Sequence, residues 1–275
     1  MKTDSTARPR RPSTPRSSCV ILVPVARSVE QPCEQGLRSL EQAGYPVRRI
    51  YGHSDIARGR SIMATEALAE GFEELLWIDS DVVFTLADVD RLRSHGVPLV
   101  GGLYPLKGKR KMAVTLLERE RLIVFGQGGG LVEVKHVATG FLYTHRSVYE
   151  TIETHHHLPR CQSDKPCGIV PYFLSVIVEE GGAHTYLSED FSFCWRARTA
   201  GLRVFADTVI RLGHVGSYTY SWEDAGQQLA RRPTYKMMMR GTSGRPSPGE
   251  GGQANEGGRA SGEEQSSEGP KTGIR

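Results

Sequence analysis

Long apolar runs are missing from this sequence of 275 residues. Its most apolar segments, such as CVILVPV at 19–25, are far shorter than the roughly 20 residues that a helix needs to cross a bilayer. The first residues, MKTDSTARPRRPSTPRS, also lack the apolar stretch of a secretory leader. We therefore expect no transmembrane segment, and membrane contact of at most a peripheral kind.

Cysteine is scarce and odd in number, which argues against a disulfide framework. Five cysteines are scattered along the chain, and we expect a reducing, cytoplasmic setting. The histidines at 155–157, together with Cys161 and Cys167, fit no familiar zinc-finger spacing. We interpret the segment 155–168 as a polar loop that forms a mobile lid over the acceptor. The aromatic PYF that follows at 171–173 is interpreted as surface suited to a sugar or an apolar acceptor.

Apolar residues are also sparse at both ends of the chain. Residues 1–17 are mostly Pro, Ser, Thr and Arg, and residues 241–275 are mostly Gly, Ser, Glu and Pro. Neither end can bury enough surface to offset its chain entropy, so we expect both to be disordered. The part that folds is then 18–240, a length typical of one α/β domain.

The excess of positive charge does not belong to this folded part. The formal net charge is +4, and residues 1–17 alone carry five basic groups against one Asp. The segment 241–275 carries four basic groups against five Glu, which leaves +1 for 18–240. A nucleic-acid-binding fold is therefore not indicated, and nucleic acid is an improbable partner.

Apolar periodicity predicts a regular alternation in the first half. Strands are expected at 19–25, 46–52 and 73–79, and helices with one apolar face at 30–43 and 54–72. Strand, helix and strand in this order imply right-handed crossovers, and thus a Rossmann-like, mostly parallel central sheet flanked by helices. The fold class is α/β.

The second half mixes strands and helices without that alternation. A strand is expected at 97–105, a hairpin from 112–118 and 121–126, a strand at 136–145 and a helix at 145–155. A further helix is expected at 188–201, with Ser188 as its cap and Phe191, Cys194, Trp195 and Arg198 on one stripe. GQGGG at 126–130 is interpreted as a hairpin turn, because no Lys-Ser/Thr pair follows as in a phosphate loop.

Two acids follow the third predicted strand. In WIDSD (77–81), Asp79 and Asp81 would point to one side of an extended chain, where they repel each other unless a cation joins them. Mn²⁺ or Mg²⁺, itself bound to a diphosphate, meets that need. Pro24 to Arg27 ends the first strand, so it is expected at the same rim of the sheet.

Two later segments carry matching chemistry. SED at 188–190 places Glu189 and Asp190 at the start of a helix, where Asp190 can serve as a rigidly held general base. GHVGSYTY places His214 between glycines, where an imidazole can complete a metal shell.

The order of these elements resembles the core of a known class of enzymes. Pro24-x-x-Arg27, ARGRS (57–61), WIDSD, VATGF (137–141), SED and a late His214 are similar to the motifs of a GT-A fold, metal-dependent (Asp-x-Asp) nucleotide-sugar glycosyltransferase of the family-2 kind. The resemblance spans about Val20 to Tyr220. It implies a nucleotide-sugar half at 18–105 and a mixed α+β acceptor half at 106–240.

The resemblance also implies roles for single residues. Asp79 would face the ribose and the metal, Asp81 and His214 the metal, and Asp190 the acceptor hydroxyl. Further expected contacts to the nucleotide sugar are Pro24, Val25, Ala26, Arg27, Asp55, Arg58 and Ser80. Expected contacts to the acceptor or the donor sugar are Lys107, Gly140, Tyr172 and Glu189.

This chain departs from the family pattern at two positions. Relatives often have Asn where this chain has Gly59, and the acidic group that usually ends the second strand is replaced by GHSD, which leaves Asp55 as the candidate. UDP- and GDP-linked donors both remain open for this reason, and the acceptor is not indicated.

The expected activity is transfer of a sugar from a nucleotide-diphosphate donor to an acceptor hydroxyl, with inversion if Asp190 is the base. A retaining reaction stays open. A nucleotidyltransferase ranks second, because PVARSVEQP lacks the glycines of a phosphate loop after the first strand. A non-catalytic nucleotide- or carbohydrate-binding protein of the same fold is the alternative from another class.

Overall fold

The computed structural model describes residues 14–109, 111–118, 120–162, 166–216, 218–225 and 234–240. The predicted tail at 241–275 and residues 1–13 of the predicted arm lie outside these ranges. Residues 14–17 of that arm are described. In the described part of the chain, none of the helices is long and apolar enough to cross a membrane.

The predicted alternation of the first half is confirmed. The elements follow in the order β1 (Cys19–Val25), α1 (Gln31–Gln42), β2 (Val47–Tyr51), α2 (Ile56–Ala69) and β3 (Glu74–Ile78). The Asp55 carboxylate starts α2, where it accepts hydrogen bonds from the backbone N–H groups of Ala57 and Arg58 at 3.0 and 3.2 Å. Both predicted crossovers are therefore present.

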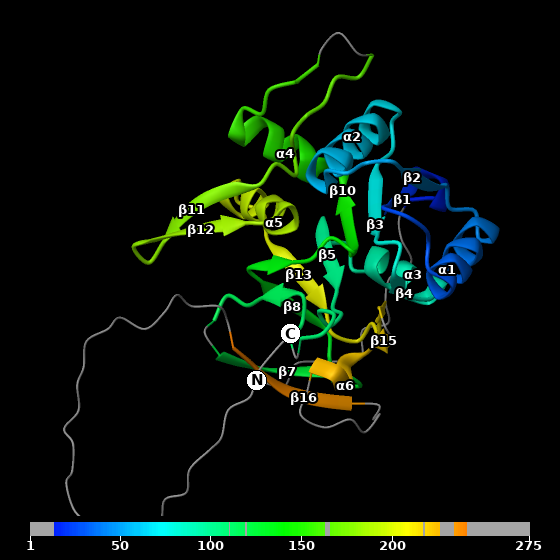
Figure 1. Cartoon of the computed structure of the whole chain (residues 1–275), viewed down its shortest axis with the longest axis vertical. Helices are drawn as coiled ribbons and strands as arrows, with labels where there is room; N and C mark the ends of the chain where they lie inside the picture. Colours follow the sequence, from blue (N-terminus) through cyan, green and yellow to red (C-terminus); the bar gives the residue numbers. More distant parts are fainter. Residues whose placement is uncertain are drawn as a thin grey trace, which may run out of the picture. The chain divides into compact units, whose positions relative to one another are not determined.

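The central sheet has seven strands in the order β2-β1-β3-β10-β5-β13-β8 (Figure 1). The second half of the chain supplies β5 (Leu99–Gly102), β8 (Leu131–Val134), β10 (Phe141–His145) and β13 (Val204–Asp207). Strands β2, β1, β3, β5 and β13 share one direction, whereas β10 and β8 run against their neighbours. The sheet is thus mostly parallel, and β10 separates β3 from β5.

Alternation along the strands divides the core between the two faces of the sheet. Val20, Leu22 and Trp77 belong to the apolar cluster that includes residues of α2, α4 (Arg146–His156) and α5 (Glu189–Thr199). Ile21, Leu76 and Ile78 belong to the cluster with α1 and α3 (Leu86–Ser94). Helices therefore cover both faces, which leaves the ends of the strands as the place where loops can form a site.

The hairpin predicted from 112–118 and 121–126 is wrong. Strand β6 (Val114–Thr115) pairs with β9 (His136–Val137), and β7 (Glu120–Gly126) pairs with β16 (Thr234–Arg240). The turn at 126–130 exists, since the N–H of Gly129 donates to the carbonyl of Gly126 at 2.9 Å. Its flanking strands β7 and β8 enter different sheets, so it is not a hairpin turn either.

Several elements were not predicted from the sequence. They are β4 (Val82–Val83), α3 with its capping box of Thr85 and Asp88, the pair β11 (Val176–Glu180) and β12 (Ala183–Leu187), β15 (Thr219–Tyr220) and α6 (Trp222–Ala225). β4 pairs with β14 (Gly213–Val215), which in turn pairs with β15. This small sheet connects the end of β3 to a segment more than 130 residues later.

Helix α5 begins and ends as predicted, but its buried stripe differs. Phe193 is fully buried and stacks on Phe173 at 4.5 Å between ring centroids, whereas Phe191 and Trp195 are only partly buried. The hydroxyl of Ser188 donates to the Asp190 carboxylate instead of capping the helix. Cys194 of the predicted stripe is fully buried, and Phe193 is buried in place of Phe191 and Trp195.

Candidate functional site

The loops that follow β1 and β3 lie side by side at one rim of the sheet. The two strands are adjacent and parallel, with Leu22 opposite Trp77. Beyond the strand ends, the N–H of Glu30 donates to the carbonyl of Ser80 at 2.8 Å. The prediction that Pro24 to Arg27 and Asp79 to Asp81 meet at the same rim is confirmed. Pro24 and Val25 are buried, and Ala26 and Arg27 are exposed.

Asp79 and Asp81 do not continue the strand, contrary to the prediction. β3 ends at Ile78, and the chain turns so that the N–H of Val82 donates to the carbonyl of Asp79 at 3.1 Å. The N–H of Asp79 is held by the carbonyl of Gly140 at 2.9 Å. Because the backbone turns here, the period of two no longer applies, and the two carboxylates have different partners.

The Asp79 carboxylate is paired with a buried arginine that the sequence analysis did not single out. Nη2 of Arg60 donates to Oδ1 of Asp79 at 2.7 Å. Burial alone would lower the pKa of Arg60, but Asp79 and then Glu189 outweigh it and leave that pKa raised. The guanidinium is therefore charged, and it neutralises part of the negative charge at this end of β3.

The Asp81 carboxylate lies between Lys107 and His214. Nζ of Lys107 is in ion-pair contact with Oδ2, and Nε2 of His214 is 3.5 Å from Oδ1. Burial would raise the pKa of Asp81, but His214 and Lys107 outweigh it and hold the pKa below its ordinary value. Asp81 is therefore ionised at neutral pH.

Pairing of β4 with β14 brings His214 to Asp81. His214 is opposite Val82, and the N–H of Val215 donates to the carbonyl of Asp81 at 2.8 Å. Nδ1 of His214 is 2.9 Å from the carbonyl oxygen of Pro105. A carbonyl can only accept, so Nδ1 carries a proton and, in neutral His214, Nε2 keeps its lone pair.

The residues around Asp81 suit a divalent cation. A carboxylate oxygen and an imidazole nitrogen 3.5 Å apart are donors that Mn²⁺ accepts, and the hydrogen bond at Nδ1 fixes the ring as it does for many metal-bound histidines. Among the described residues, no group of three or more His, Cys, Asp or Glu side chains is already assembled as a metal site. Asp79, the third expected ligand, is engaged by Arg60 instead.

Glu189 and Asp190 begin α5 on the other side of Arg60. Oε1 of Glu189 is 3.8 Å from Nε of Arg60. Oδ1 of Asp190 accepts hydrogen bonds from the Ser188 hydroxyl and from the N–H of Phe191. Burial raises the pKa of Asp190, and the nearby Asp79 adds to this, although Ser188, Phe191 and Arg60 act in the opposite direction. A carboxylate with a raised pKa is a better proton acceptor once it is ionised.

Tyr104 connects the Asp81 side of the rim to the Asp79 side. Its ring packs edge-on against His214, with 4.9 Å between centroids, and its hydroxyl accepts a hydrogen bond from the N–H of Gly140 at 3.1 Å. A Cβ at Gly140 would lie 2.3 Å from that hydroxyl and 2.7 Å from Oδ2 of Asp79. Gly140 is therefore required by close approach at the site itself.

Other predicted contacts take less central positions. Asp55 and Arg58 are exposed at the start of α2, and Ser80 is partly buried in the turn. Tyr172 is 3% exposed, packs edge-on against Tyr149 and donates to Glu153 at 2.7 Å. The expectation that Tyr172 offers surface to a sugar or acceptor is not supported, because its ring belongs to the core.

Arg60 and Tyr104 are the residues of this rim that the sequence analysis missed. Arg60 is one of two arginines in ARGRS, and helix spacing places it among the buried positions of α2 while Arg58 is exposed. A charged residue on the apolar face of a predicted helix, so close to an Asp-x-Asp motif, was the signal that could have identified it.

The loop at 155–168 gives no metal site among its described residues, which exclude 163–165. Nε2 of His156 is bonded to the carbonyl of Arg196 at 3.0 Å, and Cys161 is exposed and bridges to Ile169. The histidine at 156 is thus used to attach the end of α4 to α5. The lid interpretation stays a prediction.

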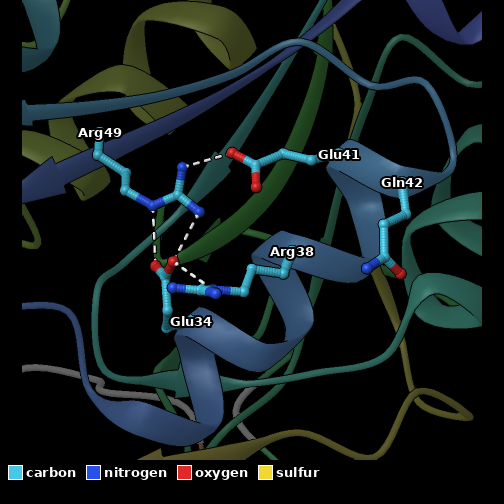
Figure 2. Close-up of a pocket in the computed structure, with 5 residues that line it drawn as sticks. All are labelled: Glu34, Arg38, Glu41, Gln42 and Arg49. Carbon is cyan, nitrogen blue, oxygen red and sulfur yellow. Dashed lines mark hydrogen bonds and ion pairs between the residues drawn. The ribbon is translucent and has the colours of Figure 1, made fainter.

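A hollow elsewhere on the surface, with a volume of about 520 Å³, does not belong to this site. Glu34, Arg38, Glu41 and Gln42 of α1 and Arg49 of β2 line it (Figure 2). Arg49 bridges Glu34 at 2.8 Å and Glu41 at 2.6 Å. Because the charges in the hollow already neutralise one another, it is a surface ion-pair network that attaches α1 to β2.

Comparison with known proteins adds little to this geometry. No protein-family model and no curated protein matches the chain. The chain is similar to the crystal structure of A197 from STIV, with 19% identity, 78% of this chain and 97% of that chain covered, and a TM-score of 0.48. It is also similar to the crystal structure of a glycosyltransferase involved in the glycosylation of the major capsid of PBCV-1, with 13% identity, 48% and 62% covered, and a TM-score of 0.28. Similarity at these levels indicates no activity for this chain.

Proposed function

We propose that this chain is a metal-dependent GT-A glycosyltransferase of the family-2 kind that moves a sugar from a UDP- or GDP-linked donor to an acceptor hydroxyl. One observation carries the proposal. A continuous series of contacts joins Asp81 through His214, Tyr104, Gly140, Asp79 and Arg60 to Glu189, next to Asp190. This series supports the proposal, because the groups that we assign to the donor and to the acceptor come from distant segments of the chain.

Asp81 and His214 would hold the cation, with Asp79 beside them once donor is bound. The bound Mn²⁺ or Mg²⁺ would supply positive charge to the departing diphosphate. Lys107 is exposed apart from its contact with Asp81, so its ammonium can transfer from that carboxylate to a phosphate oxygen. The exchange keeps each negative group paired.

The nucleoside would lie along the loop that follows β1. Pro24 and Val25 end β1, and Ala26 and Arg27 follow it. Asp55 caps the start of α2, and Arg58 lies in its first turn. Exposed Arg27 and Arg58 are available to phosphate or ribose, and the backbone of Ser80 is fixed by Glu30. Gly140 lets Tyr104 and Asp79 approach its backbone closely, and Glu189 would face the transferred sugar.

Asp190 would act as the general base. Its carboxylate takes the proton of the acceptor hydroxyl while the acceptor oxygen bonds to the anomeric carbon, and the bond from that carbon to the diphosphate breaks. The nucleoside diphosphate leaves from the opposite face, so the anomeric centre is inverted. The N–H of Phe191 and the hydroxyl of Ser188 hold the carboxylate in one orientation for this step.

We include a cytoplasmic setting in the proposal, because all five cysteines are free thiols. The acceptor class remains unassigned.

Release of nucleotide from a panel of UDP- and GDP-sugars tests the proposal, with water as the acceptor. In the presence of Mn²⁺, D190N should lower the rate by about 100-fold or more, the usual contribution of a general base. E180Q, which removes a surface carboxylate on β11, should have the wild-type rate. Equal rates for D190N and wild type would exclude Asp190 as the base, and no release from any donor by wild type would count against the transferase itself.

A further inference from the structure

Arg60 is a buried arginine with unused hydrogen-bonding capacity directly beneath the proposed site. Its side chain is 3% exposed and lies over the ring of Trp77, 5.6 Å from the ring centroid. Nη2 binds Asp79, and Nε has only the 3.8 Å approach to Glu189. Neither Nε nor Nη1 has a hydrogen-bond partner among the described atoms, although both are buried.

Such an arrangement is expensive for the fold. A guanidinium carries five N–H donors. Moving the whole charged group out of water costs several kcal/mol, and a single short ion pair offsets only part of that cost. An apolar residue of similar length would fill the same space between α2 and Trp77 at less cost. The charge at this position is therefore better explained by the site than by stability.

The surroundings indicate what the charge does. Arg60 comes from α2 in the nucleotide-sugar half, and Glu189 from α5 in the acceptor half. Electrostatic interactions with Asp79, Glu189 and Tyr104 raise the pKa of Arg60. The positive charge of Arg60 in turn lowers the pKa of Asp190. The guanidinium is thus placed between the carboxylates of the two halves.

We infer that Arg60 is a positioning residue of this site, an inference that rests on the proposed function. It holds the Asp79 carboxylate in place for the donor, and through Glu189 it ties the start of α5, and so Asp190, to the same point. The N–H groups that lack partners remain available to the Glu189 carboxylate, which lies 3.8 Å from Nε.

Calorimetric titration of UDP and GDP with Mn²⁺ tests this inference in the full-length protein. R60M should weaken binding of the preferred nucleotide by about 10-fold, because Asp79 loses its orientation. R60K, which keeps the charge but not the planar fork, should lie between R60M and wild type. If Arg60 acts through Asp79, the double variant R60M/D79N should bind no more weakly than D79N alone.

A matched control is present at the other end of β3. Arg93 forms a buried ion pair with Glu74, the first residue of that strand, so R93M breaks a similar pair far from the rim. R93M should lower the melting temperature yet leave nucleotide affinity unchanged.

The outcomes separate the inference from the proposed function. If wild type binds nucleotide and R60M or R60K binds it with the same affinity, Arg60 has no positioning role. The transferase proposal would then remain in place. Additive losses in R60M and D79N would also overturn it, since Arg60 would then act independently of Asp79. Failure of wild type to bind either nucleotide would remove both proposals.

Discussion

Nε2 of His214 lies 3.5 Å from Oδ1 of Asp81, while Nδ1 of the same ring donates to the carbonyl of Pro105. The backbone carbonyl fixes which nitrogen carries the proton, so in neutral His214 a lone pair faces an ionised carboxylate. The lone pair of Nε2 and the negative Oδ1 repel each other at this distance, unless a positive charge lies between or beside them. Lys107 supplies that charge now, and a divalent cation would supply it when donor is bound.

Lys107 and a divalent cation should therefore compete for Asp81. K107M removes the ammonium next to the carboxylate, and a surface ion pair of this kind is worth roughly 1 kcal/mol, or about five-fold in affinity. We expect K107M to bind Mn²⁺ about five-fold more tightly than wild type when titrated without nucleotide. K109M, at an exposed position two residues later, should match wild type. Weaker Mn²⁺ binding in K107M would contradict the competition.

Gly140 should tolerate no side chain. In G140A the new methyl group would approach the Tyr104 hydroxyl and Oδ2 of Asp79 to within 2.3 and 2.7 Å, so at least one of the two must move. We expect nucleotide affinity to fall by about 10-fold or more. No described atom lies within 4 Å of a Cβ built at Gly130, so G130A is the control. Normal affinity in G140A would mean that Tyr104 and Asp79 need not stay where they are.

Asp190 should lower the stability of the fold at neutral pH. Its pKa is raised, mainly by burial, so the folded state binds the proton more tightly than the unfolded state. Stability therefore falls as pH rises from the ordinary value of Asp, about 3.9, through the folded value, and stays reduced above it. D190N lacks this loss, and we expect its melting temperature at pH 7 to exceed that of wild type.

The pH dependence provides the control for D190N. Below the ordinary pKa of Asp, wild-type Asp190 is neutral in both states, so thermal scans there should show no difference between the two proteins. A difference that persists unchanged into acid would mean that the substitution acts through packing.

The last residues of the predicted basic arm should contribute to stability. Arg16 pairs with Asp90 at 2.6 Å, and Thr14 bonds to Glu74 and to Arg93. Deletion of residues 1–17 removes these partners from a buried ion pair and should cost about 1–2 kcal/mol in urea unfolding. Deletion of 1–13, which keeps Thr14 and Arg16, should cost less than deletion of 1–17. An equal effect of both deletions would contradict this.

The alternating first half could be predicted from the sequence because each element there is specified locally. Periodicity, the glycine that follows each helix and the apolar run of β3 all act within one segment. The positions of Asp79, Asp190 and His214 at one rim followed from the order of the strands and from the family resemblance.

The remaining contacts depend on pairing between distant segments, which no local signal encodes. The partner of β7 is β16, more than 100 residues later, and β6 pairs with β9 instead of with β7. The turn after Ile78 is fixed by the carbonyl of Gly140, so the directions of Asp79 and Asp81 could not be obtained from strand alternation. The contact between Arg60 and Asp79 could not be predicted, because the turn after Ile78 sets the direction of the Asp79 carboxylate.

The most direct test of the central claim is calorimetric titration of UDP and GDP into wild type and D81A, with Mn²⁺ and again with EDTA. We expect that one nucleotide binds wild type in Mn²⁺, that EDTA removes the binding, and that D81A binds at least 10-fold more weakly. Binding that is indifferent to both Mn²⁺ and Asp81, or no binding of either nucleotide, would contradict the central claim.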